Sequence, residues 1–188
     1  MDKRDVVIIR ELLKDGRASF QSLGEKLGIS RVAVMKRLKN LIENEFVKVG
    51  AMINLDKLGF KIVAVSIEIA NYKDLMKLID AYKDCPRMIC LLHTVGGYNL
   101  FALMYAENED TLMSVLDSCS IRTRKEVRRS EVVIGKMIYP LHFPICLSAG
   151  GEKEDAPCGV NCGKCERYMS EKCLGCPITR YYRPVWLD

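Results

Sequence analysis

Two short amphipathic segments joined by a glycine, within residues 20–41, constrain the fold of this chain more than any other feature. Apolar residues recur at helical spacing on both sides of Gly28, so each segment is predicted to be a helix with one buried stripe. Gly28 permits a tight left-handed turn, and Ser30 stands at the N-cap position of the second helix. The pattern predicts a helix-turn-helix, which places its second helix in the major groove of DNA.

The outward face of the second helix is cationic. The candidate DNA-contact residues are Ser30, Arg31, Lys36, Arg37 and Lys39. Residues 1–60 hold 12 Lys and Arg against 8 Asp and Glu, whereas residues 141–188 hold 6 against 6. The excess positive charge therefore lies where phosphate contact requires it. A packed helical hairpin without a DNA partner is the alternative interpretation of the same pattern.

Three regions are predicted, and together they indicate an α+β protein. Residues 1–54 form a winged helix-turn-helix domain, with three helices and a short β-wing around Gly50. Residues 55–140 alternate as βαββαβ, which predicts a ferredoxin-like ligand-binding and oligomerisation domain with both helices on one face of the sheet. The last strand is expected at 132–138. The other face lacks a cover, so a dimer through the sheets is expected.

The third region, residues 141–188, is a linker followed by a cysteine-rich segment. Its spacing is C-x3-C-x2-C-x7-C-x2-C, and the candidate metal ligands are Cys158, Cys162, Cys165, Cys173 and Cys176. Two C-x2-C pairs at the ends of a short loop favour a tetrathiolate Zn²⁺ site formed by the last four. An iron–sulfur cluster is the alternative, because Cys158 supplies a fifth thiol and Pro177 follows Cys176. A disulfide framework is disfavoured by the odd number of cysteines.

The remaining cysteines and the two histidines carry weaker signals. The isolated cysteines, predicted to be core residues, are Cys85, Cys90, Cys119 and Cys146. His93 lies inside an expected strand and is interpreted as structural, whereas His142 is a minor candidate for metal coordination.

Residues 1–140 resemble the Lrp/AsnC family of transcription regulators, of the archaeal type. The resemblance is carried by Asp5, Ile8-Ile9, Leu12-Leu13, Gly16-Arg17-Ala18-Ser19, Leu23, Leu27-Gly28-Ile29-Ser30, Val34, Arg37, Leu38, Leu41, Leu58-Gly59 and residues 94–100. It implies dimers that assemble into larger rings, and small-molecule effectors that are frequently amino acids. It also implies an effector-binding turn formed by Gly96, Gly97, Tyr98 and Asn99. Many members carry Asp where this chain has Asn99, and a neutral amide does not pair with an ammonium as a carboxylate does.

These features predict a sequence-specific regulator that binds double-stranded DNA as a homodimer or higher oligomer and responds to metal or redox state through its tail. Charges interrupt the apolar positions of the first 14 residues, and no apolar run is long enough to span a bilayer, so a cytoplasmic location without membrane contact is expected. The alternative is an enzyme of tetrapyrrole metabolism, because archaeal haem-pathway decarboxylases resemble the same build. No common catalytic motif is present, so no catalytic residue is assigned.

Overall fold

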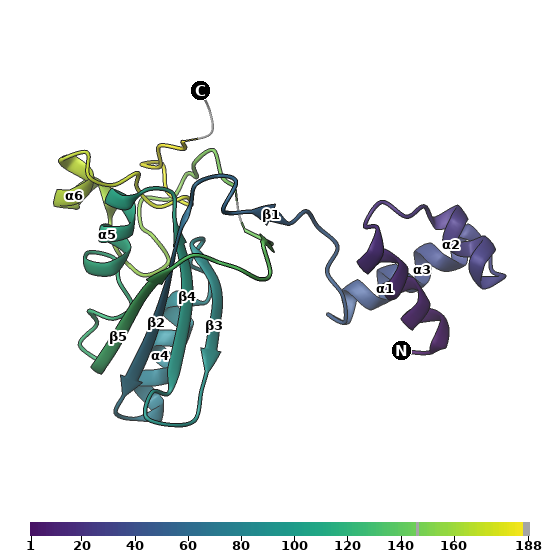
Figure 1. Cartoon of the computed structure of the whole chain (residues 1–188), viewed down its shortest axis with the longest axis horizontal. Helices are drawn as coiled ribbons and strands as arrows, with labels where there is room; N and C mark the ends of the chain where they lie inside the picture. Colours follow the sequence, from purple (N-terminus) through teal and green to yellow (C-terminus); the bar gives the residue numbers. More distant parts are fainter. Residues whose placement is uncertain (146, 186–188) are drawn as a thin grey trace. The chain divides into compact units, whose positions relative to one another are not determined.

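A computed structural model describes residues 1–145 and 147–185 of the chain (Figure 1). The chain forms two compact units, Met1–Ala51 and Met52–Asp188. The predicted regions 55–140 and 141–188 therefore share one unit. Cys146, predicted to be a core residue, lies outside the described residues. No helix in the described parts of the chain is long and apolar enough to cross a membrane.

The first unit contains the three predicted helices. They are α1 (Lys3–Lys14), α2 (Phe20–Leu27) and α3 (Arg31–Glu43). Their apolar stripes meet in a small core of Ile8, Leu23, Val34 and Leu38. Gly28 ends α2 in the left-handed conformation, with φ of 62°, and the Ser30 side chain accepts a hydrogen bond from the Ala33 N–H at 3.1 Å. The helix-turn-helix prediction is confirmed.

The turn between α2 and α3 depends on a second glycine as well. A Cβ atom on Gly24 would lie 2.6 Å from the backbone oxygen of Ile29, which is closer than real side chains approach. The absence of a side chain at Gly24 therefore allows the turn to pass directly over α2. This requirement was not evident in the sequence, because Gly24 stands inside a helix and its neighbour across the turn is set by the fold.

The predicted β-wing is wrong. Residues 47–52 contain no strand, and Ile53–Asn54 form strand β1, which pairs with β6 (His142–Phe143) instead of folding back on residues 46–49. Val47 packs against the core of the helical unit, which leaves the segment around Gly50 exposed. So short an exposed hairpin buries too little apolar surface to be stable alone.

The second unit has the predicted βαββαβ order. Its elements are β2 (Lys61–Ile69), α4 (Tyr72–Tyr82), β3 (Met88–His93), β4 (Leu100–Ala106), α5 (Glu109–Asp117) and β5 (Val127–Gly135). The strands form one antiparallel sheet in the order β3-β4-β2-β5.

The prediction that the last strand spans 132–138 is wrong by several residues. β5 begins at Val127 because its basic residues pair with the end of β2, where Arg128 and Arg129 both contact Glu68 at 3.3 Å.

The two faces of the sheet differ. One face carries the main core, where Val63, Val65 and Ile67 of β2 pack with apolar side chains of α4 and α5. The opposite face is covered at one end by a smaller cluster that includes Leu55 and Phe143. Away from that cluster it exposes Leu92 and Val133.

The tail beyond residue 148 packs along α5 and the end of the sheet, where Figure 1 shows it in yellow-green and yellow. Its regular elements are a 3-10 helix, η1 (Cys162–Lys164), and a single helical turn, α6 (Glu166–Met169). Arg167 Nε donates to Ser114 Oγ of α5 at 2.7 Å, and the Leu174 N–H donates to Thr111 Oγ1 at 3.3 Å. The tail is thus docked on the sheet domain by hydrogen bonds distant in sequence.

Candidate functional sites

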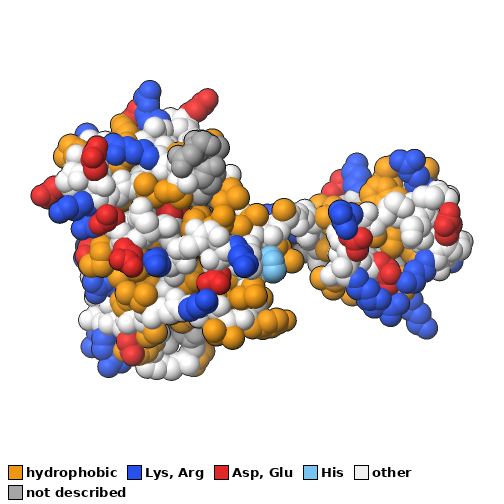
Figure 2. All heavy atoms as spheres, turned by 45° about the horizontal axis from the view of Figure 1, so that its top comes forward, with side chains coloured by type: hydrophobic (Ala, Val, Ile, Leu, Met, Phe, Trp, Pro, Cys, Tyr) orange, Lys and Arg blue, Asp and Glu red, His pale blue; other side chains and the backbone are white. Residues whose placement is uncertain are grey.

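The outward face of α3 presents the predicted DNA-contact residues. Ser30, Arg31, Lys36 and Lys39 are exposed, and Lys39 lies 3.7 Å from Glu43 on the same helix. Within the described part of the chain, neither Arg31 nor Lys36 has a carboxylate partner. Figure 2 shows Lys and Arg side chains at several places on this helical unit, with the largest group along its lower edge in that view. A helix with unpaired cations on its outer face is suited to phosphate contact.

Arg37 differs from the other candidates. Its Nη1 atom donates to Asp2 Oδ2 and to Asp5 Oδ1, both at 2.8 Å, so the guanidinium joins α3 to the beginning of α1. The Asp5 and Asp2 carboxylates raise the pKa of Arg37 further above its ordinary value. Arg37 is therefore held within the helical unit, whereas Arg31 and Lys36 are directed to solvent.

The predicted effector turn lies between β3 and β4. Gly96 has a φ of 147°, a conformation that favours glycine. The Asn99 side chain pairs with the backbone of Ile69 in both directions: it accepts from the Ile69 N–H at 2.9 Å and donates to its oxygen at 2.8 Å. The Arg129 guanidinium lies over the Tyr98 ring, 4.8 Å from its centroid. The hydrogen-bonding groups of the Asn99 side chain are thus taken up by the Ile69 backbone. The Tyr98 ring and the Arg129 guanidinium remain as the groups of the turn that a ligand can contact.

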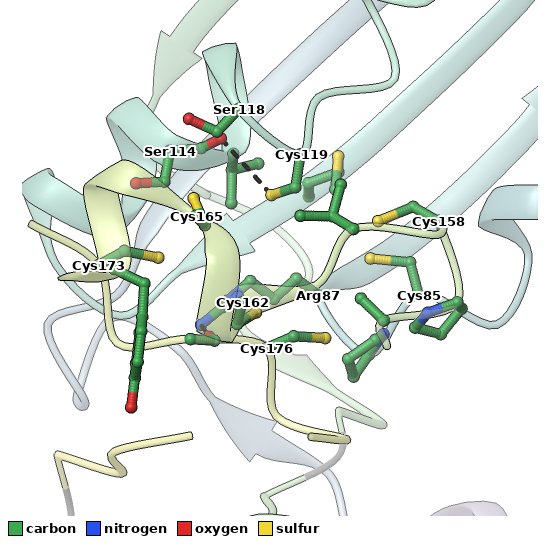
Figure 3. A pocket seen from close by; sticks show the side chains of 18 residues that line it. Cys85, Arg87, Ser114, Ser118, Cys119, Cys158, Cys162, Cys165, Cys173 and Cys176 are labelled. Carbon is green, nitrogen blue, oxygen red and sulfur yellow. Dashed lines mark hydrogen bonds between the residues drawn. The ribbon is translucent and has the colours of Figure 1, made fainter. Parts of the chain in front are cut away.

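The cysteines of the tail line one cavity together with two cysteines of the sheet domain (Figure 3). We call this the cysteine cavity, and its sulfur-bearing lining consists of Cys85, Cys119, Cys158, Cys162, Cys165, Cys173, Cys176 and Met104. Its volume is about 40 Å³. That is room for an ion or a few waters, and far too little for a tetrapyrrole.

Cys85 and Cys119 were predicted to be core residues, and they do pack against the main core. Their position at the cysteine cavity was not evident in the sequence. Cys85 follows α4 and Cys119 follows α5, so only the packing of both helices on one face brings them together. The same prediction is wrong for Cys90, which is exposed. His93 and His142 are exposed as well, and neither lines the cavity.

The thiols surround the cavity rather than meeting at a point. Among the residues that the structure describes, no three Cys, His, Asp or Glu side chains are arranged to hold one metal ion. Burial raises the pKa of Cys85 to about 11 and that of Cys176 to about 12, so these two thiols are neutral at pH 7 when no metal is bound. The donor set suits a thiophilic metal, which would have to draw the sulfurs inward and displace their protons.

A buried ion pair borders the cysteine cavity. Arg87 donates to both oxygens of Glu107, at 2.9 and 3.0 Å, and the two side chains are only 5% and 0% exposed. Two tail residues complete the arrangement: the Tyr182 hydroxyl donates to Glu107 at 2.8 Å, and the Gly175 oxygen accepts from Arg87 at 2.7 Å. Sequence reasoning missed this group, because nothing in the local pattern marks one arginine as buried.

Comparison with known proteins agrees with these observations. A family model of the AsnC-type helix-turn-helix domain matches residues 1–42. The HTH-type transcriptional regulator LrpA of Pyrococcus horikoshii is 29% identical over 119 residues, covering 63% of this chain and 84% of that protein.

Solved structures share the fold. The leucine response regulatory protein LrpA of Mycobacterium tuberculosis matches with a TM-score of 0.65 and 23% identity, over 74% of this chain and 96% of that one. The transcriptional regulator NMB0573 of Neisseria meningitidis, solved as a complex with L-Met, matches with a TM-score of 0.62 and 15% identity, over 74% and 92%.

The relatives found by sequence are regulators, which favours regulation over tetrapyrrole enzymology, and α3 has the exposed cations that such a role requires. This chain is a DNA-binding transcription regulator with an AsnC-type helix-turn-helix, and it is similar to regulators of the Lrp/AsnC type.

Proposed function

We propose that this regulator contacts DNA mainly through Arg31, Lys36 and Lys39 of α3, while Arg37 holds the helix in position. The observation that carries the proposal is the difference in pairing. Arg37 is bound to two carboxylates at 2.8 Å, whereas Arg31 and Lys36 are exposed and lack such partners in the described residues. A cation that is free in the unbound protein can contact phosphate without first breaking an internal ion pair.

The test is a double substitution, Arg31→Ala with Lys36→Ala, measured by binding to promoter fragments at several salt concentrations. If both residues contact phosphate, the slope of log affinity against log salt should fall by about 2, because each lost contact removes about 0.9 counterion. Lys14→Ala is the matched control, since Lys14 is an exposed cation of α1 bound to Glu11. An unchanged slope in the double variant would overturn the proposal.

For the sheet domain, we propose assembly of two copies through the sheet face that bears Leu92 and Val133. Paired residues on neighbouring strands carry their side chains on the same face. Leu92 pairs with Phe101, which pairs with Ser66 of β2, and Val133 pairs with Ala64, two residues from Ser66 on the same strand. Leu92 is 52% exposed and Val133 is 58% exposed, and apolar side chains on one sheet face favour burial against a partner. Val133→Glu should shift the protein toward monomer in light scattering, and an unchanged mass would contradict this interface.

A small-molecule effector is proposed for the turn at Gly96, Gly97, Tyr98 and Asn99. The accessible groups are the Tyr98 ring and the Arg129 guanidinium above it. Arg129 also lies 3.3 Å from Glu68, so the carboxylate of an effector would take the place of Glu68 at the guanidinium, whereas Asn99, which is bound to Ile69, offers no charge to an ammonium group. The complex of the Neisseria regulator with L-Met supports a search among amino acids and their keto-acid analogues, by thermal shift with Arg129→Gln as the control.

The tail is proposed to bind a metal, with Zn²⁺ as the first choice and an iron–sulfur cluster as the alternative. Support comes from the chemistry of the donors, since five tail cysteines line one small cavity. The ligands expected from spacing are Cys162, Cys165, Cys173 and Cys176, with Cys158 as the fifth thiol. Metal loss or thiolate oxidation would loosen the tail and thereby change assembly or DNA affinity.

Anaerobic purification followed by metal analysis and a visible spectrum tests this part. Zinc near one per chain without colour supports the first choice, and brown absorption supports the cluster. The double variant Cys173→Ser with Cys176→Ser should lose the metal. A protein that neither retains nor takes up either metal contradicts the metal role of the tail.

A further inference from the structure

The cysteine cavity lies at the seam between the tail and the sheet domain rather than within the tail. Figure 3 shows Cys162, Cys165, Cys173 and Cys176 on the tail, with Cys85 and Cys119 on the opposite wall. Cys85 comes from the loop between α4 and β3, and Cys119 follows the end of α5. Thiols from three separate parts of the chain therefore face one small volume.

The thiols of the tail are not closed on one another. Cys176 lines the cavity together with both Cys85 and Cys162. Cys158, the thiol left over when the two C-x2-C pairs are counted as ligands, packs with Cys85 and Cys119 against the main core. The tail thiols and the two sheet-domain thiols therefore share the lining of one cavity.

Two arginines of the sheet domain hold the tail in this position. Arg124 donates to the Cys158 oxygen at 2.7 Å and to the Tyr82 hydroxyl at 2.6 Å. Arg87 donates to the oxygen of Gly175, which directly precedes Cys176, at 2.7 Å. The backbone at or beside two tail cysteines is therefore fixed by the domain that carries Cys85 and Cys119, and both of these cysteines are partly buried against the main core.

We propose that a thiophilic metal ion binds in the cysteine cavity with Cys85 and Cys119 among its thiolate ligands, so that the metal joins the tail to the sheet domain. The proposal rests on the proposed metal binding by the tail and specifies its ligands further. Each thiol that ligates the ion releases its proton to solvent. A centre of this kind couples metal occupancy to α4 and α5, which carry the main core of the domain.

The experiment uses the full-length protein, made metal-free under anaerobic conditions and reloaded with Zn²⁺ or Co²⁺. The test variant is Cys85→Ser with Cys119→Ser, and the matched control is Cys90→Ser, an exposed cysteine outside the cavity. Zn²⁺ affinity is measured by competition with a chelator, and the sulfur-to-cobalt charge-transfer intensity reports the number of thiolate ligands. Circular dichroism shows whether each variant is folded.

We expect the test variant to bind Zn²⁺ more than about 100-fold more weakly, since loss of a merely supporting contact costs about 10–100-fold. Its charge-transfer band should also weaken, whereas the control should match the unmodified protein. If the double variant does not fold, the single variants Cys85→Ser and Cys119→Ser are measured instead, and each is expected to weaken the band.

Two outcomes overturn the proposal and differ from each other. If the sheet-domain variants bind metal with unchanged affinity and spectrum while Cys173→Ser with Cys176→Ser does not bind, the metal belongs to the tail alone. In that case the proposed function survives and the shared centre does not. If the tail variant also binds metal as the unmodified protein does, the metal role of the tail fails as well.

Discussion

The helix-turn-helix and the cysteine tail are both small, but they obtain a defined structure from different sources. The helix-turn-helix builds its own core, in which Ile8, Leu23 and Val34 are at most 2% exposed. The tail has few buried apolar side chains of its own, and it is held by polar contacts with Arg87, Glu107 and Ser114 of the sheet domain. A segment that cannot bury enough apolar surface alone requires a staple or a neighbour.

This difference explains why the two regions were predicted with unequal success. The core of the helix-turn-helix arises from contacts between residues close in sequence, so periodicity and capping residues reveal it. The docking contacts of the tail join residues far apart in sequence, such as Arg87 and Gly175. Three substitutions test this difference. Loss of a long-range contact should weaken the tail and the sheet domain, whereas loss of a local contact should weaken only the helix-turn-helix.

The largest effect is expected from breaking the buried ion pair. Arg87→Met leaves the Glu107 carboxylate buried without its cation, at a cost of about 3–5 kcal/mol in the free energy of unfolding. Urea unfolding followed by circular dichroism should show the second unit weakened and the tail more accessible to protease. The helix-turn-helix should keep its hydrogen-exchange protection.

Lys83→Met is the control, because Lys83 makes an exposed ion pair with Asp80 at 3.0 Å. Such pairs contribute little, and we expect a change within about 0.5 kcal/mol. A similar loss in both variants would show that the buried pair does not hold the tail and the sheet domain together.

An intermediate effect is expected from Gly24→Ala in the helix-turn-helix. The added methyl would lie 2.6 Å from the Ile29 oxygen, so the turn must shift, at a cost of about 1–3 kcal/mol. Gly16→Ala is the matched control, since no atom lies within 4 Å of the corresponding position. Hydrogen exchange of α2 and α3 and affinity for DNA report the result. Equal protection in the two variants would contradict a close approach at Gly24.

The smallest effect is a pH dependence confined to the first unit. The Asp5 N–H and the Arg37 guanidinium hold the pKa of Asp2 below its ordinary value of 3.8. Because the folded pKa is lowered, the stabilisation is present above pH 3.8 and is lost as the pH falls through the folded pKa. The protection factors of the α1 amides, corrected for the intrinsic pH dependence of exchange, should therefore fall at low pH, and this decrease should be smaller in Arg37→Met. An identical acid response would show that Arg37 does not stabilise ionised Asp2.

Much of the architecture followed from the sequence alone. The spacing around Gly28 indicated α2 and α3, and alternation along residues 61–69 indicated the central strand with its buried face. These signals are strong because the side chains of one element share one face, whatever the rest of the chain does. The position of the last strand was less predictable, because the sequence around Arg128 and Arg129 is typical of a charged, solvent-exposed segment. Only the fold shows that Glu68 lies opposite these arginines and pairs with them.

The candidate sites divide in the same way. Residue type and spacing were sufficient to identify the cations of α3 and the five tail cysteines as groups. Only the tertiary structure shows that Arg37 binds Asp2 and Asp5 and that the Asn99 side chain is hydrogen-bonded to the Ile69 backbone. It also places Cys85 and Cys119 on the wall of the cavity opposite the tail. The physical reason is that periodicity records which face of an element is buried, whereas a hydrogen bond or a shared cavity depends on which distant residue is packed against that face.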